Sequence, residues 1–138
     1  VDGLTIYGGI SEVEQHQNSA TINGDKSEDV IGIKYAMGGF TAGYQQTNED
    51  TGVTATTSYE NTSYGITFSV NDDLSVGYNH TESSSSQAND TSADSFQVAY
   101  TMGGASIRLM EQSVTNQTYG SAATADFDAT IISLGLAF

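Results

Sequence analysis

The sequence predicts an all-β protein: an antiparallel up-and-down transmembrane β-barrel, to which this chain contributes about eight strands. Three observations lead to this prediction. Short segments alternate between large apolar residues and small or polar ones. Their connections alternate between tight turns and long polar stretches, and the face opposite the apolar one carries almost no charge. No stretch sustains a period of about 3.6 residues, so almost no helix is expected.

The alternating segments follow one another along the whole chain. In each segment every second residue is mostly large and apolar, which is the signature of a strand with one face toward an apolar medium. In the last segment, for example, Ile132, Leu134 and Leu136 share one face, while Ser133 and Gly135 share the other. The predicted strands cover residues 4–10, 30–37, 40–47, 64–70, 74–80, 96–102, 105–110 and 128–138.

The connections between these strands alternate between short and long. Tight turns are predicted at Met37–Gly39, Asn71–Asp73 and Met102–Gly104, because Gly, Asn and Asp accept the positive φ angles that short hairpins need. Long polar connections are predicted at residues 16–28, 48–58, 81–94 and 115–126. An antiparallel meander of this kind places all tight turns at one end and all long loops at the other.

The weakly charged second face separates a membrane barrel from a soluble β-domain. A soluble sandwich or barrel would bury the apolar face and expose a charged one. Here the second face consists mainly of Gly, Ser, Thr, Ala and Gln, with Lys34 and Arg108 as its clear charges. In a membrane barrel the apolar face meets lipid and the second face lines a polar interior. Aromatic residues near strand ends fit the two membrane interfaces: Tyr35, Tyr44, Phe68, Tyr78, Tyr100 and Phe138.

Composition excludes several other classes of protein. The 3 Lys and Arg residues stand against 17 Asp and Glu, for a formal net charge of −14, so clustered cations for binding nucleic acid are lacking. There is no cysteine, hence no disulfide, thiolate metal site or cysteine nucleophile. No apolar run is long enough for a transmembrane helix. No nucleophile elbow or plausible catalytic triad appears, so we do not expect an enzyme.

Four stretches of the chain resemble a known family. "VDGLTIYGG", "SYGITFSVNDDLSVGYNHTE", "DSFQVAYTMGGASIRLMEQSVTN" and the ending "TIISLGLAF" resemble the Gram-negative outer-membrane porins of alphaproteobacteria, the Rhodobacter-like group. The resemblance implies a barrel of about 16 strands, commonly a homotrimer, that passes small hydrophilic solutes and ions passively. It also implies that Phe138 is the recognition signal for the outer-membrane insertion machinery, and that lipid and lipopolysaccharide surround the barrel.

The chain has strands for about half of such a barrel. We therefore interpret residues 1–138 as the C-terminal half of a porin. The alternative is a complete, closed outer-membrane barrel of about eight strands, whose interior is just filled by side chains and whose role is structural or adhesive. A third interpretation is a secreted, soluble acidic β-domain, which would bury the large apolar residues within the chain itself.

The candidate site residues are those that alternation places on the second, inward face. We predict Lys34, Arg108, Gln45, Thr67, Asn79 and Gln97 as pore-lining residues. Lys34 and Arg108 would form a basic strip that screens solutes by charge, or pair with neighbouring carboxylates to stabilise the barrel. Glu111 departs from the pattern, because alternation places it on the lipid face. Either its strand has left the hydrocarbon there, or a bulge shifts the alternation, or the position meets another subunit.

Acidic residues gather in or beside the predicted long connections. Asp25, Glu28, Asp29, Glu49 and Asp50 are candidate ligands for Ca²⁺ at the extracellular loops, because hard cations take several carboxylate oxygens. Their spacing matches no regular calcium loop, so solvated loop charge is the alternative interpretation. In either case a negative mouth favours cations over anions through its long-range field, which predicts a mild cation preference.

Overall fold

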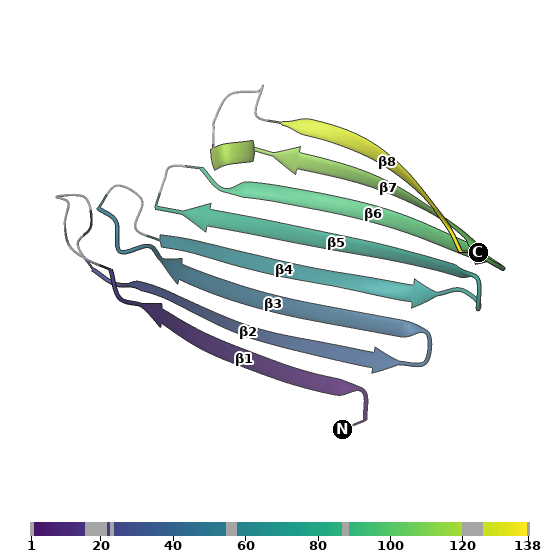
Figure 1. Ribbon diagram of the computed structural model, residues 1–138, viewed down its shortest axis with the longest axis horizontal. Coiled ribbons are helices and arrows are strands. Elements are labelled where there is room, and N and C mark those ends of the chain that lie inside the picture. Colours follow the sequence, from purple (N-terminus) through teal and green to yellow (C-terminus); the bar gives the residue numbers. More distant parts are fainter. Residues whose placement is uncertain are drawn as a thin grey trace.

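The protein is a single eight-stranded antiparallel sheet. A computed structural model describes residues 2–15, 22, 24–54, 58–86, 89–119 and 126–137. Each strand pairs with its chain neighbour, in the order β1 to β8 (Figure 1). The strands are β1 (Leu4–Val13), β2 (Lys26–Met37), β3 (Phe40–Asp50), β4 (Ser58–Ser69), β5 (Leu74–Ser85), β6 (Thr91–Met102), β7 (Ala105–Thr115) and β8 (Phe127–Leu136). The all-β, up-and-down architecture predicted from alternation is thereby confirmed.

The part of the chain that the structure describes contains almost no helix, as expected. The described residues contain one 3₁₀ turn, η1 (Gln117–Tyr119), which follows β7. None of the helical structure described is long and apolar enough to cross a membrane.

The sheet is open. β1 pairs with β2 and β8 pairs with β7, and the two outer strands do not pair with each other in the described structure. The alternative of an eight-stranded barrel closed within this chain is therefore wrong, whereas the interpretation as half of a larger barrel stays a prediction. That alternative requires β1 to pair with β8, whereas Figure 1 shows them at opposite sides of the sheet.

The sheet has no hydrophobic core of its own. Among the described residues Val114 is the only buried hydrophobic side chain. Phe68 remains 48% exposed and Leu134 67% exposed, although both belong to the apolar set. The third interpretation predicted that these side chains would be buried against one another within the chain, and the described residues do not show that burial.

The tight turns lie at one end of the sheet, as predicted (Figure 1). Gly38 and Gly103 adopt positive φ angles of 59° and 58° in the turns after β2 and β6. In the turn after β4, the Asn71 side-chain oxygen accepts hydrogen bonds from the backbone N–H groups of Asp73 and Leu74, at 2.9 and 2.8 Å. The positive φ angles of the glycines and the hydrogen bonds to the Asn71 side chain let these hairpins close without long connections.

At the opposite end the strands are longer than predicted. β2 begins at Lys26 rather than residue 30, and β5 continues to Ser85 rather than residue 80. The extended parts have polar residues on both faces, so alternation gave no signal there. Cross-strand hydrogen bonds between side chains accompany the pairing, such as Asn48 to Asp29 at 2.9 Å and Asn61 to Thr47 at 3.1 Å.

Candidate functional site

The two faces of the sheet can be followed across all strands, because the register is continuous. Residues that are directly opposite on neighbouring strands share a face. We call one such row of partners on the apolar face a rung, and name it by its β4 residue. The Phe68 rung is apolar from β2 to β8: Met37, Phe40, Phe68, Val76, Val98, Leu109 and Ile132.

The next rungs toward the loops change from apolar to polar partway across the sheet. The Ile66 rung reads Leu4, Tyr35, Ala42, Ile66, Tyr78, Phe96, Glu111 and Thr130. The Tyr64 rung reads Ile6, Ile33, Tyr44, Tyr64, His80, Asp94, Ser113 and Asp128. The Thr62 rung reads Gly8, Ile31, Gln46, Thr62, Glu82, Ser92 and Thr115. The change comes after β6, β4 and β2 respectively, so the boundary is slanted.

The boundary of this slanted apolar band has a measurable angle to the rungs. The boundary moves by two strands for each rung, and successive rungs are two residues apart. With a rise of about 3.4 Å per residue and a spacing of about 4.8 Å between strands, the boundary climbs about 7 Å for every 10 Å across the sheet, an angle of about 35°. Strands of transmembrane barrels tilt by about 35–45° from the barrel axis, and a flat membrane surface would cut their rungs at this slant.

The slant accounts for Glu111. On β7 the apolar band ends at Leu109, so Glu111 lies beyond its boundary, next to Thr130. The Thr130 hydroxyl lies 2.9 Å from each carboxylate oxygen of Glu111. Pairing with β6 and β8 is continuous through this position, which excludes a bulge. Of the three explanations for Glu111, the register supports departure of the strand from the apolar zone.

Just beyond the boundary on β5 and β6 lies a hydrogen-bonded polar cluster. The Asp94 carboxylate accepts a hydrogen bond from the Tyr78 hydroxyl and lies 2.8 Å from His80 Nδ1. The His80 ring stacks on Tyr64 with ring centroids 4.9 Å apart. Rings that combine an apolar body with a polar tip are typical of the interface between apolar and aqueous media.

The opposite face is hollowed, and the residues that line the hollow are mainly small or polar. A hollow of about 380 Å³ takes lining residues from the six strands β2 to β7, so this face is concave. All six residues predicted to line a pore lie on this face, and five of them line the hollow itself: Lys34, Thr67, Asn79, Gln97 and Arg108. Gln45 lines a neighbouring hollow, where its side chain accepts a hydrogen bond from Tyr7.

Glycines form the floor between the two cations. Gly43, Gly65 and Gly77 occupy neighbouring strands on the concave face, where the Asn79 side chain lies close to Gly65 and the Thr67 side chain close to Gly77. No carboxylate lines this hollow, and within the described part of the chain Lys34 and Arg108 have no ion-pair partner. The hollow therefore presents two unpaired positive charges on an otherwise uncharged surface.

The third basic residue, Lys26, is held differently. It lies on the concave face at the loop end, beyond the apolar band, with its ammonium 2.6 Å from Glu28 and 3.0 Å from Glu49. Hydrogen bonds to Glu28 and then to Glu49 raise the pKa of Lys26 above its ordinary value. The carboxylates of Glu28 and Glu49 thus both pair with Lys26.

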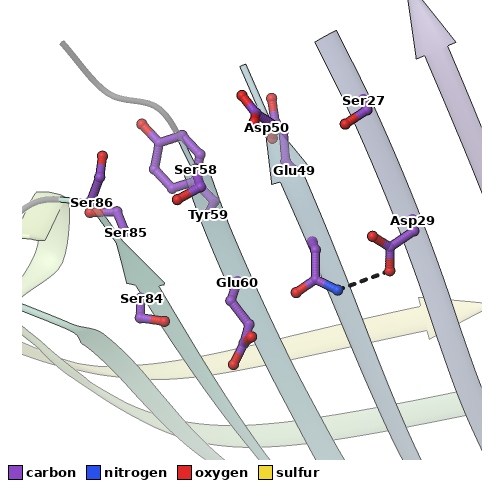
Figure 2. Close-up of a pocket in the computed structure, with 11 residues that line it drawn as sticks. Ser27, Asp29, Glu49, Asp50, Ser58, Tyr59, Glu60, Ser84, Ser85 and Ser86 are labelled. Carbon is purple, nitrogen blue, oxygen red and sulfur yellow. Dashed lines mark hydrogen bonds between the residues drawn. The ribbon is translucent and has the colours of Figure 1, made fainter. Parts of the chain in front are cut away.

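The remaining calcium candidates are divided among other contacts. Asp29 accepts its bond from Asn48, Asp50 accepts from the Gly52 N–H at 2.9 Å, and Asp25 accepts from the Gln15 N–H at 3.0 Å. Figure 2 shows the acidic, serine-rich hollow of about 330 Å³ at the loop end that Asp29, Glu49, Asp50 and Glu60 help to line. No group of three or more potential metal ligands forms among the described residues, so the calcium hypothesis gains no support.

Two further points concern the chain's ends and loops. Phe138, the predicted insertion signal, lies outside the described residues.

The turn after β7 was predicted only as a polar loop, yet its Tyr119 contacts Ser83 on the concave face. Alternation carries no information on such a turn, because its conformation depends on positive φ angles at non-glycine residues.

Comparison with known proteins identifies no relative. No protein-family model matches the chain, and no curated protein matches it. The functional argument therefore rests on the faces of the sheet.

Proposed function

We propose that the chain forms part of the wall of a water-filled transmembrane β-barrel, a porin of a Gram-negative outer membrane. It passes small hydrophilic solutes and ions by passive diffusion and has no enzymatic role. The observation that carries the proposal is the slanted apolar band on one face combined with the hollow that contains Lys34 and Arg108 on the other. Lipid would cover the exposed band, and water would fill the concave side.

The open edges support a barrel larger than this chain alone provides. β1 and β8 present unpaired backbone groups, and neither strand contains proline or lysine, two devices that protect solvent-exposed edges. In hydrocarbon every backbone polar group needs a partner within protein, so both edges require further strands. Together with the resemblance to alphaproteobacterial porins, this favours the C-terminal half of a barrel of about 16 strands, assembled as a trimer and surrounded by outer-membrane lipid and lipopolysaccharide.

The charge distribution supports a mild preference for cations. The chain as a whole carries a formal charge of −14, and acidic residues gather toward the loop end. Their field raises the local concentration of cations at the mouth. Lys34 and Arg108 act against this preference further along the wall, which keeps it mild.

Ion conductance tests the proposal. The protein is extracted from its host's membranes as its native assembly and added to a planar lipid bilayer. Stepwise increases in conductance are expected. The matched control is the same extract from cells in which the gene is deleted. If the pure assembly inserts into the bilayer and conducts no ions, the proposed function is wrong.

A further inference from the structure

The turn after β7 does not continue away from the sheet but folds back over its concave face. Tyr119 hydrogen-bonds through its hydroxyl to Ser83 on β5, with the two oxygens 2.7 Å apart, and its ring centroid lies 5.7 Å from that of Tyr59 on β4. Both Ser83 and Tyr59 belong to the concave face. Because β4 lies three strands away from β7, roughly 14 Å across the sheet, the turn must cross β6 and β5 to reach it.

Several hydrogen bonds hold the turn in this position. The Thr91 hydroxyl on β6 donates to the Asn116 carbonyl at 2.8 Å and lies 3.3 Å from the Tyr119 N–H, from which it accepts. The Asn116 amide donates to the Asp90 carbonyl at 3.1 Å, and the Asn89 amide donates to the Tyr119 carbonyl at 3.4 Å. In Figure 1 the turn lies at the loop end of the sheet, beside β6.

The backbone of the turn is strained at three residues. Asn116, Thr118 and Tyr119 have positive φ angles of 53°, 63° and 58°, a region that non-glycine residues seldom occupy. Such strain persists only where surrounding contacts fix it, and it gathers at functional sites. In this turn, contacts with Thr91, Ser83 and Tyr59 hold the strained backbone in place.

We propose that Tyr119, packed on Tyr59, narrows the loop-side mouth of the channel and sets its size limit for uncharged solutes. The two rings are large groups at the loop end of the concave face, whereas Gly43, Gly65 and Gly77 supply no side chains further along the same face. The inference rests on the proposed function, because a size limit has meaning only if the concave face lines a channel. It adds to that function a constriction supplied by the turn between β7 and β8.

The test measures permeation of sugars of increasing size. The native assembly and its variants are placed in liposomes, and swelling rates are recorded with uncharged sugars from monosaccharide to tetrasaccharide. Tyr119→Ala is expected to shift the size limit to larger sugars and to raise ion conductance. Tyr119→Phe, which keeps the ring and loses the bond to Ser83, is expected to keep the wild-type limit. Thr91→Val, which removes two of the bonds that hold the turn, should shift the limit in the direction of Tyr119→Ala.

Controls separate this inference from the proposed function. Tyr44→Ala removes a tyrosine from the apolar face and should leave the size limit unchanged. A wild-type limit in Tyr119→Ala, with wild-type channels still open, overturns the constriction and leaves the porin proposal standing. An equal shift in Tyr119→Phe and Tyr119→Ala also overturns it, because the hydroxyl rather than the ring would then be responsible. Wild-type liposomes that fail to swell in any sugar instead contradict the proposed function.

Discussion

The ring of Tyr7 on β1 lies across Gly32, its partner on β2. A Cβ atom at residue 32 would lie 2.2 Å from Tyr7 Cζ, so the ring occupies the space that any side chain there would need. The Tyr7 hydroxyl then donates to Gln45 on β3 at 2.8 Å. One side chain on the concave face thus covers a bare stretch of backbone and ties three strands together, an arrangement in which an aromatic ring compensates for a glycine in a strand.

Gly32→Ala is expected to destabilise the sheet. The added methyl group forces the exposed Tyr7 ring to move and costs its bond to Gln45, so the expected cost is about 0.5–1.5 kcal/mol, the net contribution of one hydrogen bond. Unfolding of the detergent-solubilised protein by urea, followed by circular dichroism, would measure the loss. Gly43→Ala is the matched control, because the nearest atom to a Cβ there is the Ile33 carbonyl oxygen at an ordinary 3.7 Å. Equal effects of the two substitutions would show that the Tyr7 contact is irrelevant.

The slant of the apolar band makes a second prediction, concerning two positions on one rung. Ile66 on β4 and Thr130 on β8 both belong to the Ile66 rung, yet only Ile66 lies within the band. Ile66→Arg should cost roughly 2–4 kcal/mol of stability in lipid, whereas Thr130→Arg should cost about 0–1 kcal/mol, because the penalty falls toward the membrane surface.

Urea unfolding of both variants in phospholipid vesicles would measure this difference. Ile132→Arg provides the control on β8, since this residue lies one rung further into the band and should behave like Ile66→Arg. If Thr130→Arg and Ile66→Arg are equally costly, the band is not slanted with respect to the membrane. If Ile66→Arg is harmless, the apolar face does not meet lipid.

Alternation predicted the strands and their faces because it is a local property. The spacing of residues such as Ile66, Phe68 and Val70 alone indicates which face of the strand meets an apolar medium. The tight turns were equally accessible, because Gly38 and Gly103 supply the positive φ angles that such turns require. For the same reason Lys34 and Arg108 could be assigned to one face before any coordinates were known.

The features that the sequence did not predict depend on the register between strands or on contacts within loops. Glu111 looked anomalous because the boundary of the band can be drawn only once β7 is aligned with its neighbours. Glu28 was predicted to lie in a loop and Asp29 beside it, since both faces of β2 are polar there and alternation disappears. No sequence pattern predicts the inward turn at Tyr119, because hydrogen bonds to β5 and β6 fix its position.

A third prediction concerns the lysine between two glutamates. Glu28 and Glu49 are direct partners on β2 and β3, and Lys26 bridges them. Lys26→Gln should lower the unfolding temperature, because like charges directly opposite each other in a sheet repel. The double variant Lys26→Gln, Glu28→Gln removes the repulsion and should recover most of the loss. Thermal unfolding in detergent at low salt would measure both effects, and a double variant no more stable than the single one would contradict this explanation.

The final prediction concerns charge selectivity. Lys34 and Arg108 are the cations of the concave hollow, and no carboxylate lines it. Replacing both by Glu changes the local charge by four units and should increase the preference for cations, because fixed charge on a channel wall selects mobile ions of the opposite sign. The reversal potential of the native assembly under a potassium chloride gradient measures this preference. Glu111→Gln alters charge on the opposite, apolar face and should leave the reversal potential unchanged. If the double Glu variant conducts with a wild-type reversal potential, Lys34 and Arg108 do not contribute to selectivity, and the concave hollow between them lies away from the path of the ions.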